Sequence, residues 1–176
     1  MNNKNDIKTN NKGISLIEII IVIAIMVILG GVFFLSTAVA TNKQVNSCAN
    51  KVASSLESAR SLAIGKKGAY IAIWQDVGDY VKCQIYVDGE APGGTAYGDE
   101  IAIGHPGLTV TVYTSTGSYT LAGHATKTFV SFSRSNGSVN DSIYVKSIEV
   151  KNGSRSITVE IDKFTGRVSV GGIVDI

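Results

Sequence analysis

The sequence predicts an α+β fold in which one long N-terminal helix packs on an antiparallel β-sheet. Three features support this prediction. Residues 19–40 carry no charged side chain, residues 45–63 place apolar side chains at helical spacing, and the remainder is rich in valine, isoleucine and threonine. The chain has 19 Gly but only 2 Pro, which favours strands joined by glycine turns. We therefore expect the helical part to come first and the strands to follow.

Residues 14–40 predict a membrane-spanning helix. The stretch is longer than the roughly 20 residues that cross a bilayer core of about 30 Å. The preceding residues carry Lys4, Lys8 and Lys12 against the single acid Asp6. By the positive-inside rule this leader stays in the cytoplasm. We expect a single-pass protein of the cytoplasmic (inner) membrane, with its C-terminal domain on the outer side.

Residues 41–68 predict the amphipathic half of the same helix. Apolar side chains follow spacings of three and four, at Val45, Cys48, Val52, Leu56, Ala59 and Ala63. Gly65, Lys66, Lys67 and Gly68 then provide a typical helix end, with cations for the dipole and glycines for the cap. One stripe of the helix should therefore lie on the core of the domain.

Residues 69–176 predict an antiparallel β domain. A hairpin is expected from residues 69–75 and 80–87, joined by the turn 76–79, and its second strand alternates apolar and polar side chains. The glycine-rich residues 88–99 predict a surface loop. Turns are expected at Asn152-Gly153 and Thr165-Gly166. Further strands are predicted at residues 100–103, 108–114, 129–132, 143–150, 155–161 and 167–170.

The segment Gly13-Ile14-Ser15-Leu16-Ile17-Glu18 places a lone carboxylate at the start of the apolar run. Two ordinary interpretations compete here. Ala38-Val39-Ala40 resembles a secretory signal cleaved after Ala40, and an uncleaved signal anchor is the other alternative. The run is longer than the 7 to 15 residues usual in a signal peptide, and the helical stripe begins where that cleaved protein would start. Both points argue against cleavage after Ala40.

The same segment resembles the cleavage and methylation segment of type IV prepilins and type II secretion pseudopilins. The resemblance implies that a prepilin peptidase removes residues 1–13 and that Gly13 is the last leader residue. Ile14 then becomes the N-methylated first residue, and Glu18 takes the fifth position, where this family has glutamate. Ile14 departs from the usual phenylalanine, which bears on methylation more than on cleavage.

The chemistry of Glu18 is consistent with this resemblance. A carboxylate at the centre of a spanning helix costs about 2.5–3.5 kcal/mol and usually has a partner. Cleavage before Ile14 creates an α-amine with an ordinary pKa of about 7.7–8.0, one turn from Glu18. The family therefore implies a structural subunit whose amine and glutamate pair within or between subunits of a filament. Its implied partners are the membrane, the peptidase, other subunits and the inner-membrane assembly platform.

The C-terminal part carries a second resemblance, to the GspH/FimT-type minor pseudopilins. This resemblance implies a minor subunit of a type IV pilus or a type II secretion pseudopilus. It also raises an alternative, a DNA-binding minor pilin of a competence system. The stretches that carry the resemblance are Ser58-Ala59-Arg60-Ser61-Leu62-Ala63-Ile64, residues 129–137, residues 155–161 and Thr165-Gly166-Arg167-Val168.

The DNA alternative depends on cations in the last third of the chain. Nearby acids almost cancel them, and aromatic residues that could stack on bases are not interleaved among them. The formal net charge of the whole chain is only +2. The cations concerned are Lys127, Arg134, Lys146, Lys151, Arg155, Lys163 and Arg167.

Cys48 and Cys83 should both point into the helix–sheet core. A disulfide between them is permitted outside the cytoplasm, and two buried free thiols are the other interpretation.

No pattern predicts an enzyme, a cofactor or a metal site. His105 and His124 stand in isolation, and no Gly-x-Ser-x-Gly elbow is present. The acids Asp88, Glu90, Asp99 and Glu100 lack the spacing of an EF-hand loop, so we expect a solvated acidic loop.

Overall fold

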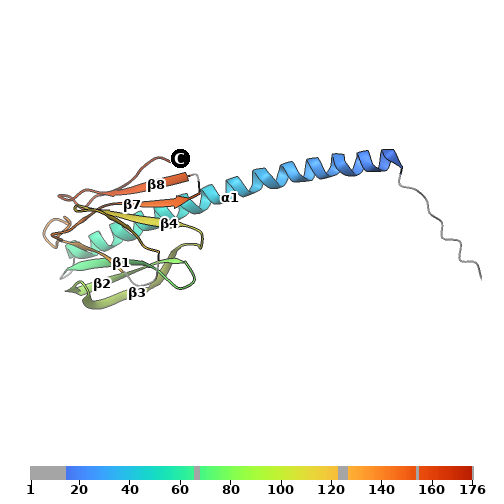
Figure 1. Cartoon of the computed structure of the whole chain (residues 1–176). Helices are drawn as coiled ribbons and strands as arrows, with labels where there is room; N and C mark the ends of the chain where they lie inside the picture. Colours follow the sequence, from blue (N-terminus) through green and yellow to red (C-terminus); the bar gives the residue numbers. More distant parts are fainter. Residues whose placement is uncertain (1–14, 66–67, 123–126, 154, 176) are drawn as a thin grey trace, which may run out of the picture. The chain divides into compact units, whose positions relative to one another are not determined.

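The computed structural model describes residues 15–65, 68–122, 127–153 and 155–175, and of residues 31–42 and 175 it describes the backbone alone. The chain divides into two compact units, residues 1–39 and residues 40–176. The first unit contains the N-terminal part of α1 (Leu16–Gly65), a helix of 50 residues. The second unit contains the rest of α1 and all the strands (Figure 1).

The amphipathic part of α1 buries the stripe that the sequence predicts. All six predicted side chains are buried, and Ala49 is buried beside them. The remaining positions between residues 43 and 65 are mostly exposed and carry serine, asparagine and lysine. Because most of the stripe is alanine, valine and cysteine, strands can approach the helix closely, and Leu56 is its largest side chain.

The strands form two antiparallel sheets rather than the single sheet that the sequence predicts. The first has the order β3-β2-β1-β6, and the second has the order β10-β8-β7-β4-β5, with β9 also paired to β8. Figure 1 shows β4, β7 and β8 in one layer and β1, β2 and β3 in another. The strands are β1 (Ala69–Gln75), β2 (Val81–Glu90), β3 (Gly93–Gly104), β4 (Thr109–Thr114), β5 (Ser118–Thr120), β6 (Thr128–Phe132), β7 (Val145–Asn152), β8 (Arg155–Ile161), β9 (Val168–Val170) and β10 (Val174–Asp175).

The predicted surface loop over residues 88–99 is wrong. The strands β2 and β3 extend through most of it and leave only Ala91 and Pro92 between them. The glycines serve close backbone packing instead of a loop, because a Cβ on Gly89 would collide with the carbonyl oxygen of Gly93. Register shifts between β2 and β3 absorb the irregular spacing.

One hydrophobic core joins the helix stripe to both sheets. The first sheet contributes Ile71, Ile73 and Val130, among others, and the second contributes residues such as Ile148 and Val159. All the core residues lie between positions 45 and 161. The unit of residues 40–176 therefore contains a complete core of its own.

The sequence predicts a membrane-spanning helix over residues 14–40. Within the part of the chain that the structure describes, no helix has both the length and the apolar character that crossing a membrane requires.

Leu56→Ala should lower the free energy of unfolding of residues 40–176 by about 2–5 kcal/mol, because the substitution leaves a cavity between the helix and the sheets. Urea unfolding followed by circular dichroism measures this change. Ser58→Ala, on the exposed side of the same helix, is the matched control and should change stability by less than about 0.5 kcal/mol. Equal effects of the two substitutions would contradict the assigned helix face.

Candidate functional site

Helix α1 begins at Leu16, two residues before Glu18. The carbonyl oxygen of Ser15 accepts hydrogen bonds from the backbone N–H of Glu18 (2.9 Å) and of Ile19 (3.3 Å). Glu18 therefore lies in the first turn, where the helix dipole stabilises a negative charge. The predicted cleavage and methylation positions, Gly13 and Ile14, lie outside the described residues.

The apolar residues that follow Glu18 are exposed on all sides of the helix. Their exposed fractions run from 47% to 76%, so the helix itself leaves them uncovered. A soluble surface seldom carries so large a continuous apolar area, and such areas mark contacts with lipid or with another protein. The residues are Leu16, Ile17, Ile19, Ile20, Ile21, Val22, Ile23, Ile25, Met26, Val27, Ile28 and Leu29.

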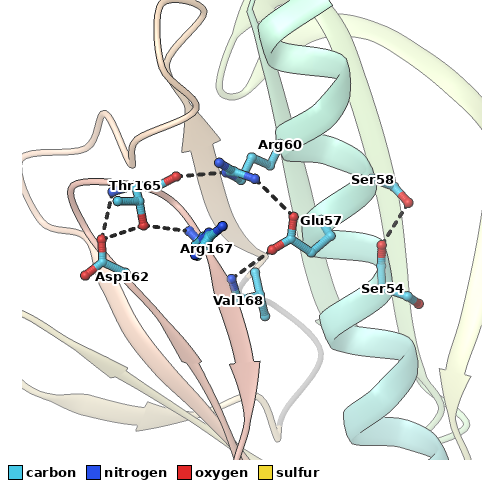
Figure 2. Close-up of polar contacts among 8 residues, drawn as sticks. All are labelled: Ser54, Glu57, Ser58, Arg60, Asp162, Thr165, Arg167 and Val168. Atoms are coloured by element: carbon cyan, nitrogen blue, oxygen red, sulfur yellow. Dashed lines mark hydrogen bonds and ion pairs between the residues drawn. The ribbon is translucent and has the colours of Figure 1, made fainter.

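A polar junction, formed by Glu57, Arg60, Thr165 and Val168, fastens the second half of α1 to the end of the β domain (Figure 2). Glu57 Oε1 accepts a hydrogen bond from the backbone N–H of Val168 (2.9 Å). Arg60 Nε donates to the carbonyl oxygen of Thr165 (2.8 Å). Arg60 Nη1 also lies 3.3 Å from Glu57 Oε2. The two side chains thus contact each other, while Arg60 binds the backbone of the turn between β8 and β9 and Glu57 binds the backbone at the start of β9.

Two glycines allow this junction to close. Gly137 and Gly166 both have positive φ, and a Cβ on Gly166 would collide with the carbonyl oxygen of Gly137. A Cβ on Gly137 would lie only 3.0 Å from Arg60 Nε and 3.1 Å from Ile64 Cδ1. The junction therefore brings together residues 58–64, 129–137 and 165–168, which are far apart in sequence.

Asp162 shapes the turn that the junction holds. Its Oδ1 accepts hydrogen bonds from the hydroxyl of Thr165 (2.7 Å) and from the backbone N–H groups of Thr165 and Phe164. These bonds hold the pKa of Asp162 below its ordinary value. The pKa of Asp162 is therefore lower in the folded chain than in the unfolded chain. The stabilisation from these hydrogen bonds is complete above the unfolded pKa and is lost as pH falls through the folded pKa.

On the face of α1 that points away from the junction, serine side chains form hydrogen bonds with the backbone of the same helix. The hydroxyl of Ser54 donates to the carbonyl oxygen of Lys51 (3.0 Å), and that of Ser58 donates to the carbonyl oxygen of Ser54 (2.8 Å). Figure 2 shows Ser54 and Ser58 on the face away from Thr165. One turn earlier, Asn50 Nδ2 donates a hydrogen bond to Asn46 Oδ1 (2.8 Å).

Cys48 and Cys83 are both buried, and both thiols are free. Cys83 Sγ lies 3.5 Å from Ser55 Oγ, whereas Cys48 Sγ lies against Gly104 beside Val81. Burial raises the pKa of Cys48 to about 12, and burial also raises the pKa of Cys83 against an opposing hydrogen bond with Ser55. The disulfide between them stays a prediction, and as free thiols they pack as small apolar side chains.

A cleft of about 600 Å³ lies at one end of the first sheet. Asp88 and Glu90 line it on the β2–β3 side, and Arg134 and Asp141 line it beyond β6. Asp141 already accepts a hydrogen bond from the backbone N–H of Ser131 (3.1 Å). Within the described residues, no group of three or more His, Cys, Asp and Glu side chains could hold a metal ion.

The other predicted candidates do not converge on a site. Glu100 lies 3.8 Å from Lys82, away from the cleft that Asp88 and Glu90 line. His105 contacts Tyr80 edge to face at 6.2 Å between ring centres, and His124 lies outside the described residues.

Two of the cations behind the DNA alternative lie over aromatic rings. The amine of Lys127 is 4.3 Å from the ring centre of Trp74, and that of Lys163 is 4.6 Å from the ring centre of Tyr144. Both lysines therefore have intramolecular contacts.

Glu57→Ala should destabilise residues 40–176 by about 1–2 kcal/mol, because the N–H of Val168 loses its acceptor. Glu57→Gln keeps an acceptor oxygen and loses only a half-exposed ion pair, so its cost should stay below about 1 kcal/mol. Urea unfolding measures both, with Lys51→Ala on the exposed face as control. A cost for glutamine equal to that for alanine would refute the assigned role of the Val168 bond.

Neither thiol should react with iodoacetamide in the folded protein at pH 8, because both are buried and almost no thiolate forms. Mass spectrometry after labelling, with and without guanidinium, measures this. Two additions in guanidinium without reductant would show free thiols. Additions that appear only after reduction would show the disulfide, and rapid labelling of the native protein would contradict the burial.

Residues 8–34 match the family described as the prokaryotic N-terminal methylation motif. No curated protein and no solved structure matches the chain. The matched residues include Gly13, Ile14 and Glu18, so this segment is similar to a type IV prepilin-like methylation motif.

Proposed function

We propose that this protein is a minor pilin or pseudopilin, a structural subunit of a type IV pilus or a type II secretion pseudopilus. The methylation motif at residues 8–34 is the observation that carries the proposal. The exposed apolar surface of residues 16–29 supports it, because a subunit of this kind needs an apolar helix that other chains or lipid can cover.

Processing would supply the partner that Glu18 needs. Cleavage between Gly13 and Ile14 releases a positively charged amine close to the first turn of α1. N-methylation of Ile14 keeps this charge, so the amine can pair with Glu18 of the same chain or of a neighbour. In an apolar surrounding the pair is favoured, because a lone buried carboxylate costs several kcal/mol.

The two units then have separate roles. Residues 14–40 anchor the chain in the inner membrane and pass into the filament, with the leader in the cytoplasm and residues 40–176 outside. The β domain supplies the exposed surface of the subunit. The implied partners are prepilin peptidase, other subunits and the assembly platform, and the role is structural rather than enzymatic.

Expression with a prepilin peptidase should give a mature chain that begins at Ile14, carrying one methyl group if methylation is efficient. Edman sequencing and intact-mass analysis measure the start and the methylation. Gly13→Val should leave the leader attached, while Ser15→Ala, two residues away, should be processed normally. A mature chain that begins at Thr41 would overturn the proposal in favour of a secretory signal.

Glu18→Ala should leave cleavage intact and reduce incorporation into filaments by at least about tenfold, because the loss of a buried charge partner costs more than about 1.4 kcal/mol. Quantitative immunoblots of sheared filaments and membranes measure the two pools. Asp99→Ala removes an exposed acid of the β domain and serves as the control. Normal incorporation of Glu18→Ala would contradict the pairing role of Glu18.

A further inference from the structure

The chain contains two Asn-Gly-Ser sequences, at residues 136–138 and 152–154. An asparagine before glycine can lose its side-chain amide, because glycine has no Cβ to hinder attack by its own backbone nitrogen on the asparagine Cγ. The two sites share the same following residues, so their intrinsic reactivities are matched. Any difference between them in the folded protein must come from the structure.

At Asn136 the structure opposes this reaction. The attacking nitrogen, on Gly137, donates a hydrogen bond to the carbonyl oxygen of Ser133 (2.8 Å). The side chain of Asn136 is held as well, since its Oδ1 accepts a hydrogen bond from the backbone N–H of Ser138 (3.1 Å). Gly137 is also buried against Arg60 and Ile64, which leaves little room for the backbone to rotate.

At Asn152 the described residues form no restraint of this kind. Asn152 ends β7 and Gly153 is the exposed residue that follows it in the hairpin to β8. Within the described residues, no hydrogen bond engages the side chain of Asn152 or the backbone nitrogen of Gly153. A Cβ on Gly153 would have no atom within 4 Å, so the backbone there has open space around it.

We propose that Asn152 is a site of spontaneous deamidation in the folded protein and that the hydrogen-bonded, buried turn at Gly137 protects Asn136 from the same reaction. The Gly153 nitrogen attacks Cγ of Asn152 and loses its proton, a C–N bond forms, and the Cγ–Nδ2 bond breaks with release of ammonia. Water then opens the resulting succinimide at either carbonyl carbon. The products are aspartate and isoaspartate at position 152.

The pairing of Asn152 in the β7–β8 ladder determines how aspartate and isoaspartate at this position would affect the hairpin. Its partner across the β7–β8 ladder is Arg155, so an aspartate places a carboxylate opposite a cation. Isoaspartate adds a methylene to the backbone at the pair that closes the hairpin, so it should disturb this pair. The pairs farther along, such as Ile148 with Val159, lie in the core and should stay in register.

The test incubates the purified full-length chain in detergent at pH 8 and 37 °C, with and without guanidinium, and follows both sites by peptide mass spectrometry. Cleavage after glutamate yields residues 150–160, and trypsin yields residues 135–146, which fragment ions resolve from Asn140. Incubation continues until the denatured chain has reacted at both sites.

In the folded chain Asn152 should convert at least about tenfold faster than Asn136, the effect expected from one hydrogen bond on the attacking nitrogen. In guanidinium the two rates should agree within about twofold, because the hydrogen bonds are lost. Asn136→Gln should leave the rate at Asn152 unchanged, and Asn152→Gln should abolish its conversion. Equal rates in the folded chain, faster conversion at Asn136, or conversion of Asn152 only in guanidinium would each overturn the proposal.

Discussion

The burial of one stripe of small side chains on α1 is the interaction on which the β domain depends. Val45, Val52 and Ala59 belong to the same core as residues of both sheets, so the helix stripe is the element that the two sheets share. Small side chains let the strands approach the helix axis, and a larger residue there would force them apart. The junction of Glu57 and Arg60 fixes the orientation of the helix at this contact. Their hydrogen bonds to Thr165 and Val168 form only when the helix presents this one face to the β domain.

Helix α1 thus carries two different surfaces, one in its N-terminal part and one in its C-terminal part. Up to Leu29 its side chains are apolar on every side and exposed, whereas from Val45 only one stripe is apolar and that stripe is buried. The domain therefore folds without using the first surface, which remains available for association. This division is what a subunit requires if its folding and its assembly are separate events.

The sequence predicts most of this fold because its signals are local. The stripe to Ala63, the strands β1 and β8, and the turns at Gly153 and Gly166 follow from spacing within a few residues. The loop over residues 88–99 was wrong, because glycine indicates a turn and close strand packing equally well. The short strands β5 and β10 lack an alternating pattern and depend on their neighbours. The prepilin-like segment is also local and could be found, whereas the junction joins Glu57 to Val168 across 111 positions. Glu57 and Arg60 stand out on a helix of small residues, but nothing near them in sequence indicates their partners at Thr165 and Val168.

The serine hydroxyls on the outward side of α1 have a further consequence. Because Ser54 and Ser58 donate to carbonyl oxygens of their own helix, neither hydroxyl depends on solvent for an acceptor. Covering these two hydroxyls with another protein would therefore leave neither donor unsatisfied, and neither would demand an acceptor from the covering surface. At these two positions a covering surface could therefore differ in its polar groups or shift along the helix axis without leaving either hydroxyl unsatisfied.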